Sequence, residues 1–208
     1  MKPSFILNIK LNSVEFQENG FQPEEARELV ALLEENKFDF VELSGGTYEK
    51  LVMHHQREST KAREAFFLEF AEQITPALRK TKSYITGGLK TVGAMVNALD
   101  VCDGVGIGRA VCQEFHLPKD IIAGRLTGAI EPKMDMTDFG FTSLVAGTQI
   151  KQVGKDHEPI DMSDQANVDA FMQDLQTWME KMQNNKDGKD YGFIDLTTKA
   201  VSYGEVSA

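Results

Sequence analysis

The stretch Lys82–Arg109 constrains the fold more than any other part of the chain. It contains two short β-rich runs, and each ends in glycine and leads directly into a helix-like segment. The first run ends in Gly87 and Gly88, and the second ends in Gly108, which Arg109 follows. Short strands that alternate with helices predict an α/β fold with a parallel sheet built from βα units.

The two glycine turns also predict a phosphate site. Glycine lets the backbone approach a ligand closely, and the N–H groups that begin the following helix favour an anion. In an eight-stranded βα barrel, the loops after strands seven and eight commonly form such a site. Either turn alone could be an ordinary helix cap. Together, and with an arginine that can donate two hydrogen bonds to one phosphate, they favour Gly87, Gly88, Gly108 and Arg109 as phosphate-binding residues.

The run from Gly104 to Gly108 superficially resembles the glycine fingerprint of dinucleotide-binding folds. That fingerprint needs a strand before its first glycine and the start of a helix at its last. Here the glycines lie within the predicted strand itself, directly after a helix. The pattern therefore argues against a dinucleotide-binding fold.

Two more βα units precede this stretch, so that four consecutive units are expected. Alternating or continuous apolar runs mark the strands, and apolar residues at helical spacing mark the helices. The predicted strands are Ser4–Leu11, Phe38–Leu43, Lys82–Thr86 and Asp103–Ile107, and the predicted helices are Pro23–Asn36, Thr60–Lys80 and Thr91–Leu99.

Lys10 is a candidate ligand-binding residue on the first strand. The alternation places it on the less apolar face, which would point into a barrel, near the carboxyl end where barrel ligands bind. The residues leave two readings open, an ordinary solvated lysine or one that holds a ligand's negative charge. Glu42 has the same orientation on the second strand, and we expect the two side chains to face each other.

The chain changes character after Arg109. A short helix is expected at Pro118–Gly124, an irregular segment at Thr127–Pro159, and a last helix that begins at the cap Ser163. We expect one domain, 1–208, with the βα units in 1–125 and a C-terminal helical extension in 126–208 whose helix spans about 163–184.

Composition excludes several classes of protein. The 208 residues carry a net charge of −10 and no basic run, which argues against nucleic acid or an anionic membrane as a partner. Cys102 and Cys112 have no metal-site spacing and are expected to be reduced thiols in a cytoplasmic protein. His54 and His55 are expected to be a solvated loop pair, and no metal site is predicted. No apolar run is long enough for a membrane span or a signal peptide.

Several blocks together resemble the old yellow enzyme family of FMN-dependent NAD(P)H oxidoreductases, in the branch common in fungi and bacteria. They cover almost the whole chain in the right order, but they correspond to the carboxyl-terminal half of that family alone. The blocks are Ile9–Phe16, Val41–Glu49, Arg63–Ala71, Tyr84–Thr91, Asp103–Ala110, Ala146–Ile150 and Glu158–Asp164.

The resemblance implies a fold, a cofactor and a reaction. The fold is the C-terminal half of a TIM (β/α)8 barrel, and the reaction passes hydride from NADPH or NADH through FMN to an activated alkene such as an enone. Lys10 takes the place of the basic residue beside the flavin pyrimidine, where it stabilises the anion formed on reduction. Gly87 and Gly88 match the first phosphate turn, and Gly108 and Arg109 match the second.

The family's substrate-binding histidine pair and tyrosine proton donor come from the other half of the barrel, so catalytic residues cannot be placed in this chain. The resemblance therefore implies a truncated oxidoreductase. The alternative is a non-catalytic half-barrel that binds a phosphate ligand or a protein. A four-stranded half leaves two open sheet edges, which predicts a homodimer or pairing with the missing half-barrel.

Overall fold

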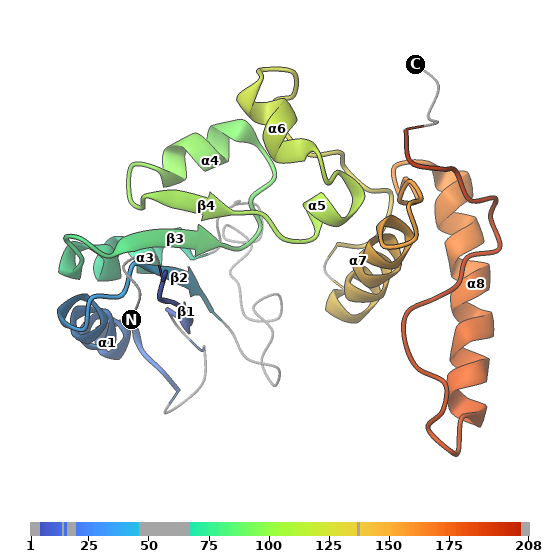
Figure 1. Cartoon of the computed structure of the whole chain (residues 1–208), viewed down its shortest axis with the longest axis horizontal. Helices are drawn as coiled ribbons and strands as arrows, with labels where there is room; N and C mark the ends of the chain where they lie inside the picture. The colour runs from blue at the N-terminus through green and yellow to red at the C-terminus, as the bar shows by residue number, and fades with distance from the viewer. Residues whose placement is uncertain (1–4, 14, 16–19, 46–66, 137, 205–208) are drawn as a thin grey trace. The chain divides into compact units, whose positions relative to one another are not determined.

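A computed structural model describes residues 5–13, 15, 20–45, 67–136 and 138–204. The chain divides into two compact units, Met1–Gly108 and Arg109–Ala208 (Figure 1). The division falls where the sequence changes character, at Arg109. That the whole chain forms one domain stays a prediction.

A parallel four-stranded sheet forms the first unit. Its strands pair in the order β1-β2-β3-β4, the same order as in the sequence. A βα barrel adds its strands in sequence, whereas doubly wound sheets reverse direction at a switch point. The predicted α/β class with parallel βα units is confirmed, and the strand order is that of a barrel segment. The strands are β1 Asn8–Asn12, β2 Phe40–Ser44, β3 Lys82–Thr86 and β4 Gly104–Gly106.

Helices connect these strands, and local signals in the sequence fix where they begin. Helix α1 has Pro23 in its first turn, and Gln22 and Glu25 form a capping box around its free N–H groups. Helix α4 begins after Thr91, whose hydroxyl oxygen accepts a hydrogen bond from the Ala94 N–H at 3.2 Å. The helical elements are α1 Pro23–Glu35, α3 Leu68–Ile74, the 3-10 turn η2 Thr75–Ala77, and α4 Val92–Ala98.

The two faces of the sheet differ in character. Val41, Leu43 and Ile85 are fully buried on one face. The opposite face carries Lys10 and Glu42 in the middle of their strands, which is the alternation that the sequence predicts. The sheet of the first unit therefore has one buried apolar face and a second face that bears charged side chains.

The second unit is helical. The sequence predicts an irregular segment over Thr127–Pro159, and this prediction is wrong, because helix α7 runs through it. Helix α7 itself carries apolar and small residues on nearly all of its sides. It therefore shows no single apolar stripe of the kind that marks a surface helix. The helices are α5 Ala110–Gln113, α6 Leu117–Ile122, α7 Phe139–Val153 and α8 Gln165–Asn184.

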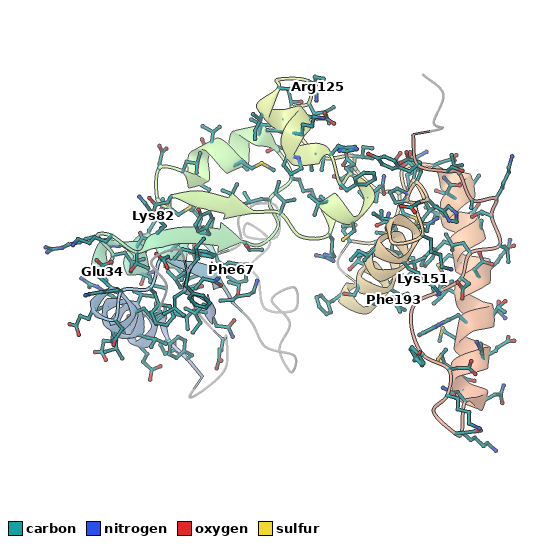
Figure 2. The ribbon with its side chains drawn as sticks, in the orientation of Figure 1. Glu34, Phe67, Lys82, Arg125, Lys151 and Phe193 are labelled. Carbon is teal, nitrogen blue, oxygen red and sulfur yellow. The ribbon has the colours of Figure 1, made fainter. Side chains whose placement is uncertain are left out.

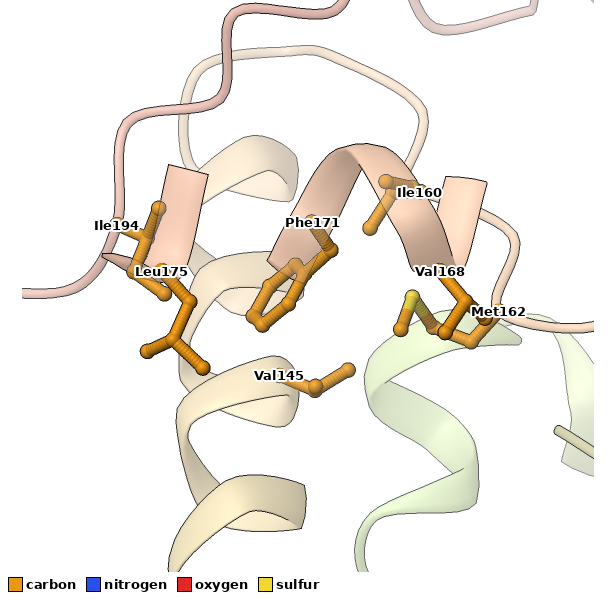
Figure 3. Packing of buried hydrophobic residues seen from close by; sticks show 7 residues of the cluster. All are labelled: Val145, Ile160, Met162, Val168, Phe171, Leu175 and Ile194. Carbon is orange, nitrogen blue, oxygen red and sulfur yellow. The ribbon is translucent and has the colours of Figure 1, made fainter. Parts of the chain in front are cut away.

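A compact apolar cluster holds α7 and α8 together (Figure 3). The predicted last helix is confirmed, although Asp164 rather than Ser163 caps it. Trp178 is partly buried and packs against the cluster, so it helps to anchor α8. The cluster consists of Val145, Ile160, Met162, Val168, Phe171, Leu175 and Ile194.

Candidate flavin site

The strand register places a row of side chains across the charged face of the sheet. Lys10 of β1 pairs in register with Glu42 of β2, Glu42 with Tyr84 of β3, and Tyr84 with Gly104 of β4. Neighbouring strands lie about 4.8 Å apart, so these residues are direct neighbours. The row lies two residues before Asn12, the last residue of β1, near the edge of the sheet where ligands bind in βα barrels.

Lys10 and Glu42 form an ion pair in this row. The Lys10 Nζ lies 2.6 Å from the Glu42 Oε1, which confirms that the two side chains face each other. Partial burial acts to raise the pKa of Glu42, but the hydrogen bond from Lys10, the positive charge of Lys10 and the nearby Thr86 hydroxyl outweigh it and hold that pKa below its ordinary value. Glu42 is therefore a carboxylate at neutral pH.

Thr86 is a site residue that the sequence analysis missed. Its hydroxyl is buried and makes no hydrogen bond of ordinary geometry with the described residues, although it lies close enough to Glu42 to help lower that pKa. A Cβ at Gly106 would collide with this hydroxyl, and one at Gly104 would collide with the Tyr84 ring. The glycines within β4 therefore make room for side chains of β3, which confirms that they belong to a strand and not to a dinucleotide loop.

The two predicted glycine turns leave the same edge of the sheet. Thr86 and Gly106 are partners in register, so the turns that follow them begin side by side. Gly87 has φ 152° and Gly88 has φ 72°, and a residue with a side chain rarely adopts such conformations. A Cβ at Gly108 would meet no atom within 4 Å, so this turn has open space beside its backbone.

Arg109 belongs to the second unit, and its guanidinium contacts a helix of that unit. Its guanidinium donates a hydrogen bond to the hydroxyl of Thr142 on α7, and burial lowers its pKa. Lys10, Gly87, Gly88 and Gly108 all belong to the first unit. The joint phosphate site of the glycine turns and Arg109 stays a prediction.

The described residues show neither a metal site nor a membrane-spanning helix. Their His, Cys, Asp and Glu side chains form no group of three or more that could hold a metal ion. His54 and His55 lie outside the part of the chain that the structure describes. None of the helices in that part has the length and apolar character needed to cross a membrane.

Comparison with known proteins gives a consistent set of relatives. The NADH-dependent flavin oxidoreductase nadA of Aspergillus parasiticus is 44% identical over 183 residues, which are 87% of this chain and 41% of the relative. The chain is a homologue of the NADH-dependent flavin oxidoreductases. A second flavin oxidoreductase, iccE of Talaromyces variabilis, is 33% identical over 127 residues, or 57% of this chain and 31% of the relative. The resemblance to flavin oxidoreductases that the sequence blocks indicate is confirmed.

This flavin oxidoreductase homologue spans 41% of the length of the Aspergillus relative. A solved complex of 2-naphthoyl-CoA reductase with 2-naphthoyl-CoA matches 56% of this chain and 18% of that chain, with 22% identity and a TM-score of 0.47. No protein-family model matches the chain.

Proposed function

We propose that the chain is part of an FMN-dependent NAD(P)H oxidoreductase of the old yellow enzyme type, which reduces activated alkenes such as enones in the cytoplasm. The observation that supports this most strongly is the 44% identity to an NADH-dependent flavin oxidoreductase over 87% of the chain. The names of the relatives favour NADH over NADPH as the reductant.

The residues at the edge of the sheet are compatible with FMN. When bound, FMN supplies hydride transfer between a nicotinamide and an alkene. The positive φ of Gly88 and the open space beside Gly108 suit close approach of a phosphate group to the backbone. Helices α4 and α5 have only seven and four residues, so the backbone of the turns is a stronger argument than the helix dipoles.

Lys10 would act on the other end of the cofactor. Its side chain is about half exposed on the charged face of the sheet, and its ammonium is held in place by Glu42. A fixed positive charge beside the flavin pyrimidine stabilises negative charge that develops there on reduction. We assign no proton donor and no substrate-binding residue, so the chain would supply cofactor contacts while other segments position the alkene.

A second candidate function is a non-catalytic half-barrel that binds a phosphate ligand or a protein. It fits a chain to which we assign no proton donor and no substrate-binding residue. The two functions differ in colour and turnover, because an FMN enzyme absorbs visible light and oxidises a nicotinamide.

Cofactor binding gives the first test. We expect the purified 208-residue chain to bind added FMN, and Arg109→Ala to weaken that binding at least tenfold, because a bidentate phosphate contact would be lost. Arg125→Ala is the matched control, since Arg125 is an exposed arginine that pairs with Asp120. Equal FMN affinity in the two variants would show that Arg109 does not contact the phosphate.

Turnover gives the second test. NADH-driven reduction of cyclohexenone by the FMN-loaded chain would support the oxidoreductase, and comparison with NADPH would identify the preferred reductant. A chain that binds no FMN and reduces no enone would favour the non-catalytic half-barrel.

A further inference from the structure

We propose that Glu42 is a positioning residue for the flavin, which fixes the ammonium of Lys10 and offsets its charge, and so limits how strongly the site favours reduced over oxidised FMN. The inference rests on the proposed function. It concerns a residue that does not itself need to contact the cofactor.

The geometry of the pair makes it a fixed feature. Lys10 and Glu42 are register partners in the middle of neighbouring strands, and 2.6 Å separates their charged atoms. Strand backbones are rigid compared with loops, so neither side chain has to be brought into place from a mobile segment. Another ion pair of this unit joins Lys82, the first residue of β3, to Asp103, which directly precedes β4, so it lies where these strands begin (Lys82 in Figure 2).

The surroundings of Glu42 keep its carboxylate aimed at Lys10. Tyr84 is its register partner on the other side, and the Thr86 hydroxyl lies near it. The Glu42 side chain is 30% exposed, whereas that of Lys10 is 56% exposed, so the ammonium is the more accessible member of the pair. An ammonium has three donors, and one bond to Glu42 leaves donors for a ligand oxygen.

The charge balance of the pair predicts its effect on a flavin. A lysine alone would favour a ligand that gains negative charge, whereas a lysine paired with a carboxylate has a net charge near zero. Removal of the carboxylate charge should therefore strengthen binding of reduced FMN more than binding of oxidised FMN. At an effective dielectric constant near 20, a unit charge several ångströms from the flavin changes the ratio of its affinities for reduced and oxidised FMN by about tenfold or more.

The experiment compares the affinities of the full chain for oxidised FMN and for anaerobically reduced FMN. In Glu42→Gln we expect the ratio of reduced to oxidised affinity to rise about tenfold, which equals an increase of about 30 mV in the two-electron potential of the bound flavin. Lys10→Gln should lower the same ratio. Glu42→Asp keeps the charge and should restore a ratio close to that of the unmodified chain.

Asp187→Asn is the matched control, because it removes one negative charge from a lysine pair in the second unit and should leave the ratio unchanged. If Glu42 had a merely structural role, Glu42→Gln would weaken both affinities equally, and this result would overturn the inference. Failure of the unmodified chain to bind FMN would instead overturn the proposed function, and this inference with it.

Discussion

At the scale of single residues, Glu34 shows how one carboxylate can join two segments that lie far apart in the sequence. It lies near the end of α1 and accepts hydrogen bonds from the backbone N–H groups of Arg79, Lys80 and Thr81 at 3.1, 3.1 and 2.9 Å (Figure 2). These bonds, those from Thr81 and Arg79 above all, lower the pKa of Glu34 from 4.5 to about 2. The carboxylate therefore binds the chain just before β3.

Glu34→Gln should lower the melting temperature at pH 7, because the amide is a weaker acceptor than the carboxylate for these three N–H groups. A folded-state pKa below the unfolded value contributes stability that is present above about pH 4.5 and lost as the pH falls towards 2. The difference between the variant and the unmodified chain should therefore shrink over that range. Thermal unfolding at several pH values measures this, with Glu35→Gln as the exposed control; equal melting temperatures for the two variants at pH 7 would contradict the role of Glu34.

Among the helices and strands, local signals in the sequence predicted the bounds of β3 and α1 closely but did not predict α7. The bounds predicted for β3, Lys82–Thr86, are those observed, and α1 ends one residue before its predicted end. Asp138 caps α7 by accepting a hydrogen bond from the Phe141 N–H at 2.8 Å, and this cap was the available signal. Glycines within the helix and the lack of a polar face obscured it, because packing rather than intrinsic propensity stabilises a buried helix.

Buried amides explain why two of the blocks that resemble the flavin enzymes belong together. Gln149 of α7 is 3% exposed and donates hydrogen bonds to the Gln113 side chain at 3.1 Å and to the Ile160 carbonyl at 3.0 Å. Gln113 in turn accepts a bond from the Met162 N–H at 3.1 Å. The blocks Ala146–Ile150 and Glu158–Asp164 are therefore joined through a polar network, which no pattern of hydropathy reveals.

Asp174 of α8 anchors the last segment of the chain. It is 6% exposed and accepts hydrogen bonds from the N–H and the hydroxyl of Thr197, both at 2.8 Å, so it ties the last segment of the chain to the helix. Asp174→Ala should cost about 1–3 kcal/mol in the free energy of unfolding, because it removes two hydrogen bonds to a buried, charged carboxylate. Chemical denaturation measures the loss, and Asp169→Ala on the exposed side of α8 should cost much less. Similar losses in both variants would refute the anchor.

At the scale of the whole molecule, sequence patterns indicated which residues share a face of the sheet but not how closely they approach. Alternation along the strands brought Lys10 and Glu42 together in the prediction, and the structure confirms this pair. Thr86 was missed, because its position against Glu42 depends on the register between β2 and β3 and on glycines in β4 that leave space for it. Arg109 lies in the second unit, where its guanidinium contacts Thr142, so its place beside the glycine turns of the first unit stays a prediction.

The open edges of the sheet support a prediction about the 208-residue chain as a whole. No strand of the described residues pairs with the outer edge of β1 or β4, and Phe5 and Ile6, just before β1, are 61% and 64% exposed. Unpaired edges beside exposed apolar side chains promote association. We expect the chain alone to sediment as a dimer or larger species, because a second copy can pair its β1 with the free edge of β4.

Ile6→Lys should shift the population towards monomer, because it places a charge beside the free edge of β1. Ile122→Lys on α6 changes another exposed isoleucine and should leave the population unchanged. A single monomeric species at all concentrations in analytical ultracentrifugation would contradict this association.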